Sequence, residues 1–192
     1  MIDTRLMFVE GLPSGSGDDP GDGASLLAQR TKRQLDLNGI ECNWYHAGFH
    51  GHPLHRRYEP EAFASPDEYA LALSVQWQNF AARTEAESGV WLFDSALLQP
   101  APASLLAAGL REDRVDAMMA ELLEAVAPLK PVMVYLWREA PANADPNWTR
   151  FRDWADALFA HRHERRLLIN ASHVGPDEAL GDFLGFLGVR RI

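Results

Sequence analysis

Cysteine is nearly absent from this chain, which has one, Cys42, among 192 residues. A lone cysteine cannot form an internal disulfide, so we expect a fold held by its core and a protein of the reducing cytoplasm. A chain of this length, 47% hydrophobic, can bury about 70% of its unfolded surface. The composition therefore predicts one compact domain over residues 1–192.

Lysine is also scarce: Lys32 and Lys130 are the only two, and the net charge is −9. Proteins that bind nucleic acids cluster cations to neutralise phosphates, so we expect no nucleic-acid partner. No apolar run approaches the ~20 residues of a membrane-spanning helix, and no basic start precedes an apolar segment as in a secretory signal. We therefore expect a soluble, cytoplasmic protein whose partner is a small molecule, a nucleotide or another protein.

What the chain does contain is an alternation of short apolar runs and amphipathic stretches. The apolar runs have the length of strands buried in a parallel sheet. Five strand–helix units predict an α/β fold, a three-layer sandwich around a five-stranded, mostly parallel sheet. The predicted strands lie near residues 5–10, 40–45, 90–94, 131–137 and 166–170, and the predicted helices near residues 24–38, 66–87, 112–127, 147–162 and 177–187.

Residues 5–39 give the most informative pattern: an apolar strand, a loop with five glycines between Gly11 and Gly23, and a helix. This is the layout of a phosphate-binding P-loop. In such a loop backbone N–H groups and a lysine contact the phosphates, and a Ser or Thr hydroxyl holds magnesium.

The details of that motif are only partly kept. Counting from Gly11, the match fails, because residues 16–18 are Ser, Gly and Asp. Counting back from the helix, residues 21–25 read like the end of such a loop, with Ala24 at the lysine position and Ser25 at the hydroxyl position. The pattern therefore predicts the fold more strongly than the activity.

Further segments match one family in order along most of the chain. They are residues 8–13 (FVEGLP), 38–40 (NGI), 44–46 (WYH), 51–54 (GHPL), 93–95 (FDS) and 131–136 (PVMVYL). With them the chain resembles the P-loop kinases of the nucleoside and nucleotide kinase group, especially a thymidylate-kinase-like branch. The resemblance implies a P-loop NTPase fold and, in an active member, phosphoryl transfer from ATP with magnesium. In an inactive member no cofactor is expected.

The resemblance also assigns roles to individual residues. It makes Ser25 and Asp94 the magnesium ligands and places His46 where the catalytic base stands, Asp94 being the second catalytic candidate. It brings two arginines from the lid region toward the phosphates. The residues expected at the phosphates are Gly11, Gly21, Gly23, Ala24, Ser25, Arg150 and Arg152.

Each of these side chains also has a structural interpretation. Asp94 suits a cap of the segment after its strand, and His46 suits a polar loop without a catalytic task. Arg150 and Arg152 suit ion pairs with Asp153 or Asp156 on an exposed helix face. Glu10, at the end of the first predicted strand, is a weaker candidate for the site.

Electrostatics weigh against ordinary ATP binding. Asp18, Asp19 and Asp22 lie in the loop, and no lysine occurs before Lys32. Two like charges ~4 Å apart repel by about 4 kcal/mol at an effective dielectric of 20, more than one helix dipole returns. Two compensations remain open: an aspartate that meets the phosphates through magnesium, or an arginine from elsewhere. The candidate arginines are Arg30, Arg33, Arg138, Arg150 and Arg152.

Two other groups of residues have alternative interpretations. His46, His50, His52 and His55 are imidazoles of the kind that bind zinc or nickel, but their spacing favours solvated loop histidines. Six aromatic side chains suit either an acceptor pocket or packing of a helix on the sheet. These six are Trp44, Tyr45, Phe49, Trp77, Phe80 and Trp91.

The sequence thus leaves alternative functions. The first is a catalytically impaired binding or regulatory module with a P-loop NTPase fold. The second is a divergent small-molecule or nucleoside/nucleotide kinase that uses ATP and magnesium. A third alternative is a stabilising subunit that pairs with a relative, and a homodimer is compatible with the chain.

Overall fold

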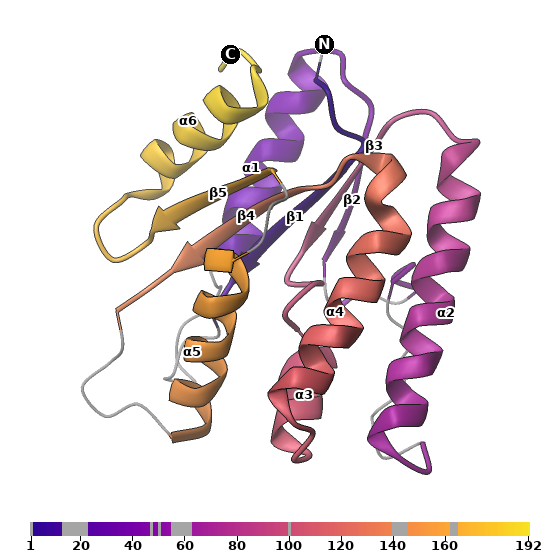
Figure 1. Ribbon diagram of the computed structural model, residues 1–192. Helices are drawn as coiled ribbons and strands as arrows, with labels where there is room; N and C mark the ends of the chain where they lie inside the picture. The colour runs from indigo at the N-terminus through magenta and orange to yellow at the C-terminus, as the bar shows by residue number, and fades with distance from the viewer. Residues whose placement is uncertain are drawn as a thin grey trace.

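The computed structural model describes residues 2–12, 23–46, 48–49, 51–54, 63–99, 101–139, 146–161 and 165–192. Within these residues five strands form one sheet, all parallel, in the order β2-β3-β1-β4-β5 (Figure 1). The strands are β1 (Leu6–Gly11), β2 (Cys42–His46), β3 (Val90–Asp94), β4 (Val132–Trp137) and β5 (Arg165–Asn170). The helices are α1 (Gly23–Leu37), α2 (Pro66–Glu85), α3 (Ala101–Ala107), α4 (Glu112–Val126), α5 (Pro146–His161) and α6 (Pro176–Leu187), with a short 3-10 helix η2 (Ala127–Leu129).

The helices cover both faces of the sheet. Helices α1 and α6 lie together on one face, and α2, α3, α4 and α5 lie on the other (Figure 1). The chain runs from β1 to β2 in one direction along the sheet and makes its later crossovers in the opposite direction. Because crossovers between parallel strands keep one hand, a reversal of direction moves the connecting helix to the opposite face. The result is a three-layer α/β sandwich.

The strand pleat divides the core between these two faces. On β1, Leu6 and Phe8 belong to the cluster under α2–α5, whereas Met7 and Val9 belong to the cluster under α1 and α6. All four side chains are fully buried. Since β1 is buried on both faces, it reads in the sequence as a continuous apolar run, as predicted.

The face under α2–α5 is the aromatic one. Phe8 stacks on Trp77 of α2 with 5.5 Å between ring centroids, and Phe80 meets Trp91 edge to face at 5.3 Å. Such pairs contribute about 0.5–1.5 kcal/mol beyond the area they bury. Trp77, Phe80 and Trp91 are therefore packing residues, which confirms the structural interpretation of that part of the aromatic set.

Local signals fix several ends of these elements. Ser65 caps α2, its hydroxyl accepting a hydrogen bond from the Glu68 N–H at 3.2 Å, and Pro66 occupies the first helical position. Gly39, at φ 70°, takes the left-handed conformation just after α1. Both features agree with the sequence pattern. No helix among the described residues is both long and apolar enough to cross a membrane.

The lone cysteine begins an edge strand. Cys42 is the first residue of β2, and its side chain is buried. Burial raises the pKa of the Cys42 thiol to about 12. The thiol is therefore neutral at physiological pH and behaves as a small apolar side chain.

Candidate functional site

The sheet has its topological switch point at β1. The helix after β1 packs on one face, whereas the helices after the neighbouring strands β3 and β4 pack on the other. Open α/β sheets bind their ligands in the crevice at the carboxyl ends of strands at such a point. The candidate site is therefore the carboxyl end of β1 with the amino end of α1, defined by Gly11, Gly23, Ser25, Asp94 and Arg138.

Gly11 brings the amino end of α1 close to β1. A Cβ placed on Gly11 would lie 3.4 Å from the Cβ of Ala24 and 3.9 Å from its backbone nitrogen. Ala24 is fully buried, so it packs the first turn of α1 against the strand. A lysine side chain at position 24 would have to extend out of this buried space to reach a phosphate. The alanine that stands there is a packing residue instead.

Arg138 supplies a positive charge at the amino end of α1. It is the first residue after β4, and a Cβ placed on Gly23 would lie 3.6 Å from Arg138 Nη2. The amino end of a helix carries about half a positive charge in addition, and its N–H groups are anion donors. The structure thus brings together two features that favour an anion at Gly23.

Asp94 connects three elements of the site. It is the last residue of β3 and is fully buried. Its Oδ1 accepts a hydrogen bond from Ser25 Oγ at 3.3 Å, and its Oδ2 accepts one from Trp44 Nε1 at 2.8 Å. The two residues assigned to magnesium therefore lie in direct contact, and Trp44 of β2 fixes the orientation of the carboxylate.

Glu10 lies one residue before the end of β1 and holds the turn that follows β3. Its carboxylate accepts hydrogen bonds from the N–H groups of Ala96, Leu97 and Leu98 at 2.8–3.0 Å. Burial raises the pKa of Glu10 to about 8; the three N–H donors act in the opposite direction, and the charge of Asp94 adds to the increase. Glu10 therefore acts on the site by positioning the turn after Asp94.

That turn contains a residue in a costly conformation. Ser95 has φ 53°, in the left-handed region that residues other than glycine rarely adopt, and its N–H donates to the carbonyl of Val9 at 2.9 Å. The conformation costs about 1 kcal/mol relative to an ordinary one. It lets the chain reverse directly after Asp94, so that the next three N–H groups reach Glu10.

The contact between Ser25 and Asp94 fits a magnesium site. Neighbouring oxygen ligands of octahedral Mg²⁺ lie about 3 Å apart, and magnesium needs only one or two protein ligands when a phosphate and water complete the shell. The 3.3 Å separation between Ser25 Oγ and Asp94 Oδ1 meets this requirement. No group of three or more His, Cys, Asp or Glu side chains suited to a metal occurs among the described residues.

His46 ends β2 beside Asp94 in the strand register. Its ring is exposed, and its Nδ1 accepts a hydrogen bond from the Gly48 N–H at 2.9 Å. His46 thus lies at the carboxyl end of the sheet, as expected for a site residue. Its ring also has a structural role, because it accepts the hydrogen bond from Gly48.

Arg150 and Arg152, predicted at the phosphates, have carboxylate partners. Arg150 Nε lies 3.0 Å from Glu112 Oε1 at the start of α4. Arg152 contacts Asp153 at 2.6 Å and reaches Asp156 at 4.0 Å. The ion pairs of Arg152 agree with its structural interpretation, whereas Arg150 pairs with Glu112 of α4 in place of the expected Asp153 or Asp156. Of the five candidate arginines, Arg138 is the one whose guanidinium adjoins Gly23.

Several predicted features fall outside the described residues. These are Gly21 of the phosphate set, the loop acids Asp18, Asp19 and Asp22, and the histidines His50 and His55. The candidate site is therefore built from the residues on either side of the glycine-rich loop.

Sequence reasoning missed the task of Glu10 and the bond from Trp44. Glu10 was one acidic residue at a strand end, and nothing in its neighbours indicates that it accepts N–H groups from residues 96–98. Trp44 had a signal, because its strand aligns with the strand that ends in Asp94. Arg138 had one too: it directly follows the strand predicted over residues 131–137.

No model of a known protein family matches the chain, and no curated protein matches it.

Proposed function

We propose that this chain binds the phosphate groups of a nucleotide at the amino end of α1 and acts as a binding or regulatory module with a P-loop NTPase-like, nucleotide-kinase-like fold. The single observation that carries this is the Arg138 guanidinium beside Gly23. It supplies the cation that Ala24 cannot. The central position of β1, with the sheet's switch point at its carboxyl end, supports the same assignment.

The described residues account for three contacts to such a ligand. Backbone N–H groups in the first turn of α1 meet a phosphate oxygen, as at other helix amino ends. Arg138 faces the same oxygen or its neighbour with its planar fork of donors. Ser25 and Asp94 would hold magnesium, which when bound would neutralise phosphate charge.

The same residues explain why the module is a poor kinase. ATP carries about four negative charges. One arginine with a helix dipole neutralises less of this charge than a complete P-loop with its lysine does. The loop acids Asp18, Asp19 and Asp22 add repulsion. We therefore expect weak, magnesium-dependent binding, with Kd in the high micromolar to millimolar range.

Calorimetric titration with ATP and magnesium tests the proposal. We expect saturable binding to the wild type and a loss of at least about tenfold in affinity in Arg138→Gln, since a charge-assisted hydrogen bond is removed. Arg83→Gln is the matched control, because Arg83 is an exposed arginine on α2 paired with Glu87 at 3.8 Å. Absence of binding to the wild type, or equal losses in both variants, would contradict the proposal.

The second candidate function is a divergent nucleoside/nucleotide or small-molecule kinase. The exposed ring of His46, which ends β2 beside Asp94, favours it, because a module that only binds a nucleotide needs no base. Here His46 would act as base and ATP as phosphoryl donor, and Ser25 and Asp94 would again hold magnesium. Micromolar affinity for ATP together with phosphoryl transfer to a nucleoside or nucleotide, lost in Asp94→Asn, would establish this alternative over the module.

A further inference from the structure

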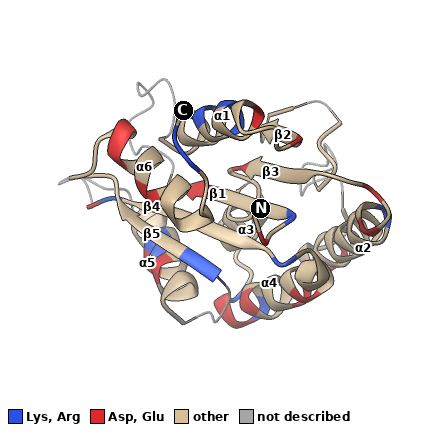
Figure 2. Cartoon of the chain, turned by 90° about the horizontal axis from the view of Figure 1, so that it is seen from above, with Lys and Arg blue, Asp and Glu red and all other residues tan. Residues whose placement is uncertain are grey.

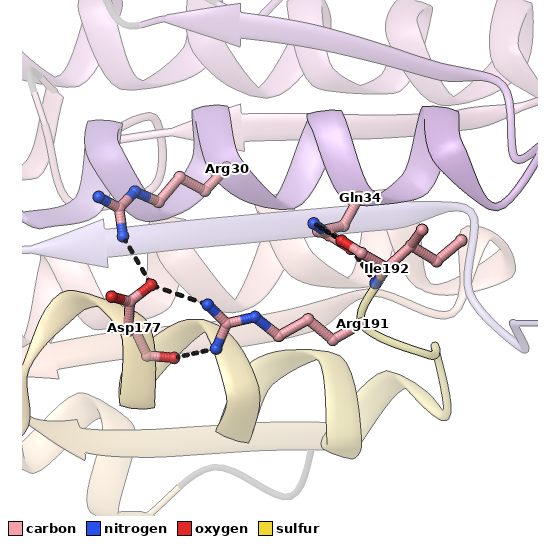
Figure 3. Close-up of polar contacts among 5 residues, drawn as sticks. All are labelled: Arg30, Gln34, Asp177, Arg191 and Ile192. Atoms are coloured by element: carbon pink, nitrogen blue, oxygen red, sulfur yellow. Dashed lines mark hydrogen bonds and ion pairs between the residues drawn. The ribbon is translucent and has the colours of Figure 1, made fainter.

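A second polar depression lies on the flank of α1, away from its amino end. It has a volume of about 370 Å³ and opens between α1, α6 and the residues after α6 (Figure 3). Its polar lining is basic, with one acidic side chain. The lining residues are Arg30, Arg33, Gln34, Leu37, Asp177, Leu180, Arg191 and Ile192.

One carboxylate holds two of the arginines in place. Asp177 Oδ1 lies 3.3 Å from Arg30 Nη1 and 2.8 Å from Arg191 Nη2. Arg191 also donates to the backbone carbonyl of Asp177 at 3.1 Å. Figure 3 shows the two guanidinium groups reaching Asp177 from different elements. The arginines are therefore oriented before any ligand arrives, which lowers the entropic cost of binding.

The third arginine of the depression, Arg33, can direct its charge at a ligand. Arg33 follows Arg30 by three residues and so lies on the same side of α1, where it is exposed. Among the residues that the structure describes, no carboxylate lies within ion-pair distance of Arg33. Three arginines against one aspartate give the side chains that line the depression a formal charge of +2, in a protein of net charge −9. Figure 2 shows basic residues gathered on α1 and on the C-terminal segment.

The remaining walls set the size and character of a ligand. Gln34 is fixed by two hydrogen bonds to the backbone of Ile192, at 3.0 and 2.8 Å, so its amide forms a rigid wall (Figure 3). Leu37 and Leu180 add apolar surface beside the guanidinium groups. The depression thus suits a compact anion with a small carbon body. Guanidinium forks match the oxygens of a phosphate group in both spacing and charge.

We propose that this depression binds a soluble phosphate monoester. The phosphate lies between Arg33 and the pair Arg30 and Arg191, and the carbon portion rests on Leu37 and Leu180. Arg30 lies seven positions after Gly23 on α1, about 10 Å along the helix axis. The site is therefore distinct from the one at the amino end of α1 and stands independently of the proposed function.

Titration of ¹⁵N-labelled protein followed by NMR tests the site with three probes at constant ionic strength: glycerol 3-phosphate, inorganic phosphate and uncharged glycerol. We expect saturable shifts of the amides of Asp177, Leu180 and Arg191 with both phosphates and none with glycerol. Arg33→Gln should weaken binding by about tenfold. The substitution leaves no carboxylate unpaired, so the fold should be unchanged.

Two control variants separate this site from nonspecific attraction and from the other candidate site. Arg83→Gln makes the same charge change on α2, and Arg138→Gln removes the cation at Gly23. Both should leave the shifts at Asp177 and Leu180 as in the wild type. The proposal is overturned if those shifts do not saturate, if Arg33→Gln and Arg83→Gln weaken them equally, or if they disappear in Arg138→Gln.

Discussion

Two aspartates of this protein each accept hydrogen bonds from two side chains, but they differ in burial and in the charge of those partners. Asp94, at the end of β3, accepts hydrogen bonds from Ser25 and Trp44 and is fully buried. Asp177, in the first turn of α6, accepts from Arg30 and Arg191, and 75% of its side chain is exposed. Among the described residues, the donors to buried Asp94 are thus neutral, whereas the donors to exposed Asp177 are cationic.

The difference shows that burial, more than the charge of the partners, decides what an aspartate contributes to stability. Around Asp177 water competes for every donor, and exposed ion pairs contribute about 0–1 kcal/mol. The carboxylate of Asp94 is fully buried, so water replaces it as an acceptor less easily, and each unsatisfied buried donor costs about 1–3 kcal/mol. Asp94 should therefore matter for folding and for the proposed magnesium site, whereas Asp177 should matter for the ligand alone.

The largest effect is expected from truncating the two aspartates in turn. Asp94→Ala should lower the free energy of unfolding by about 2 kcal/mol, because the indole N–H of Trp44 loses its acceptor. Asp177→Ala should change it by less than about 0.5 kcal/mol. Urea unfolding followed by circular dichroism measures both values. Equal losses in the two variants would remove the basis of the comparison.

A second expectation concerns Glu10, whose buried carboxyl lies near enough to Asp94 for the charge of Asp94 to raise its pKa. Its pKa in the folded protein, about 8, lies above the ordinary value of 4.5, so the folded state binds the proton more tightly. The stability that this proton contributes is present below pH 4.5 and is lost as the pH rises through 8. The slope has an upper limit of about 1.4 kcal/mol per pH unit.

Glu10→Gln provides the matched control for this pH dependence, since glutamine has the same shape and does not titrate. The free energy of unfolding of the wild type should fall relative to the variant between pH 5 and 8, as measured by urea unfolding at each pH. Parallel curves over this range would show that Glu10 keeps the same charge in both states.

A third expectation compares two hydrogen bonds of the same kind and length. Trp44 Nε1 donates to buried Asp94 at 2.8 Å, and Trp154 Nε1 donates to exposed Asp116, also at 2.8 Å. Trp44→Phe should cost about 1 kcal/mol more than Trp154→Phe through the hydrogen bond itself. Thermal unfolding of both variants measures the difference. A larger loss in Trp154→Phe would reverse the ranking of the two sites.

The smallest effect is expected at Asp177, the exposed aspartate, and it concerns the affinity for the ligand rather than the stability of the fold. Asp177→Asn removes the one negative charge in the α1–α6 depression and keeps the shape. We expect glycerol 3-phosphate to bind about threefold more tightly, with the gain fading in high salt, as for any exposed charge. The same NMR titration at two salt concentrations gives the measurement, and weaker binding would show that the orientation of Arg30 and Arg191 by the carboxylate outweighs the removal of its charge.

Most of the fold was accessible from the sequence because its signals are local. Buried strands appear as apolar runs, and Ser65 with Pro66 marks the start of α2 unambiguously. Helix α3 (Ala101–Ala107) was not predicted, since seven residues show too little of a helical period to be recognised. The assignment of the fold to P-loop kinases stays a prediction.

The candidate site was predictable only in part because its decisive contacts are not local. Ser25 and Asp94 were named from their positions, and the structure brings them together. Glu10 meets N–H groups more than 80 residues away along the chain. Such a contact depends on the sheet order, in which β3 lies beside β1, and no spacing rule within a sequence encodes it.

The buried thiol of Cys42 is a built-in probe of how often the edge strand β2 opens. A thiol with so high a pKa, closed in at the first residue of the edge strand β2, is shielded from alkylating reagents until that strand separates. The rate at which iodoacetamide labels the folded protein therefore reports how often β2 separates from β3 at the position of Val90. Since the chain has no other cysteine, the whole labelling signal comes from the sulfur atom of Cys42.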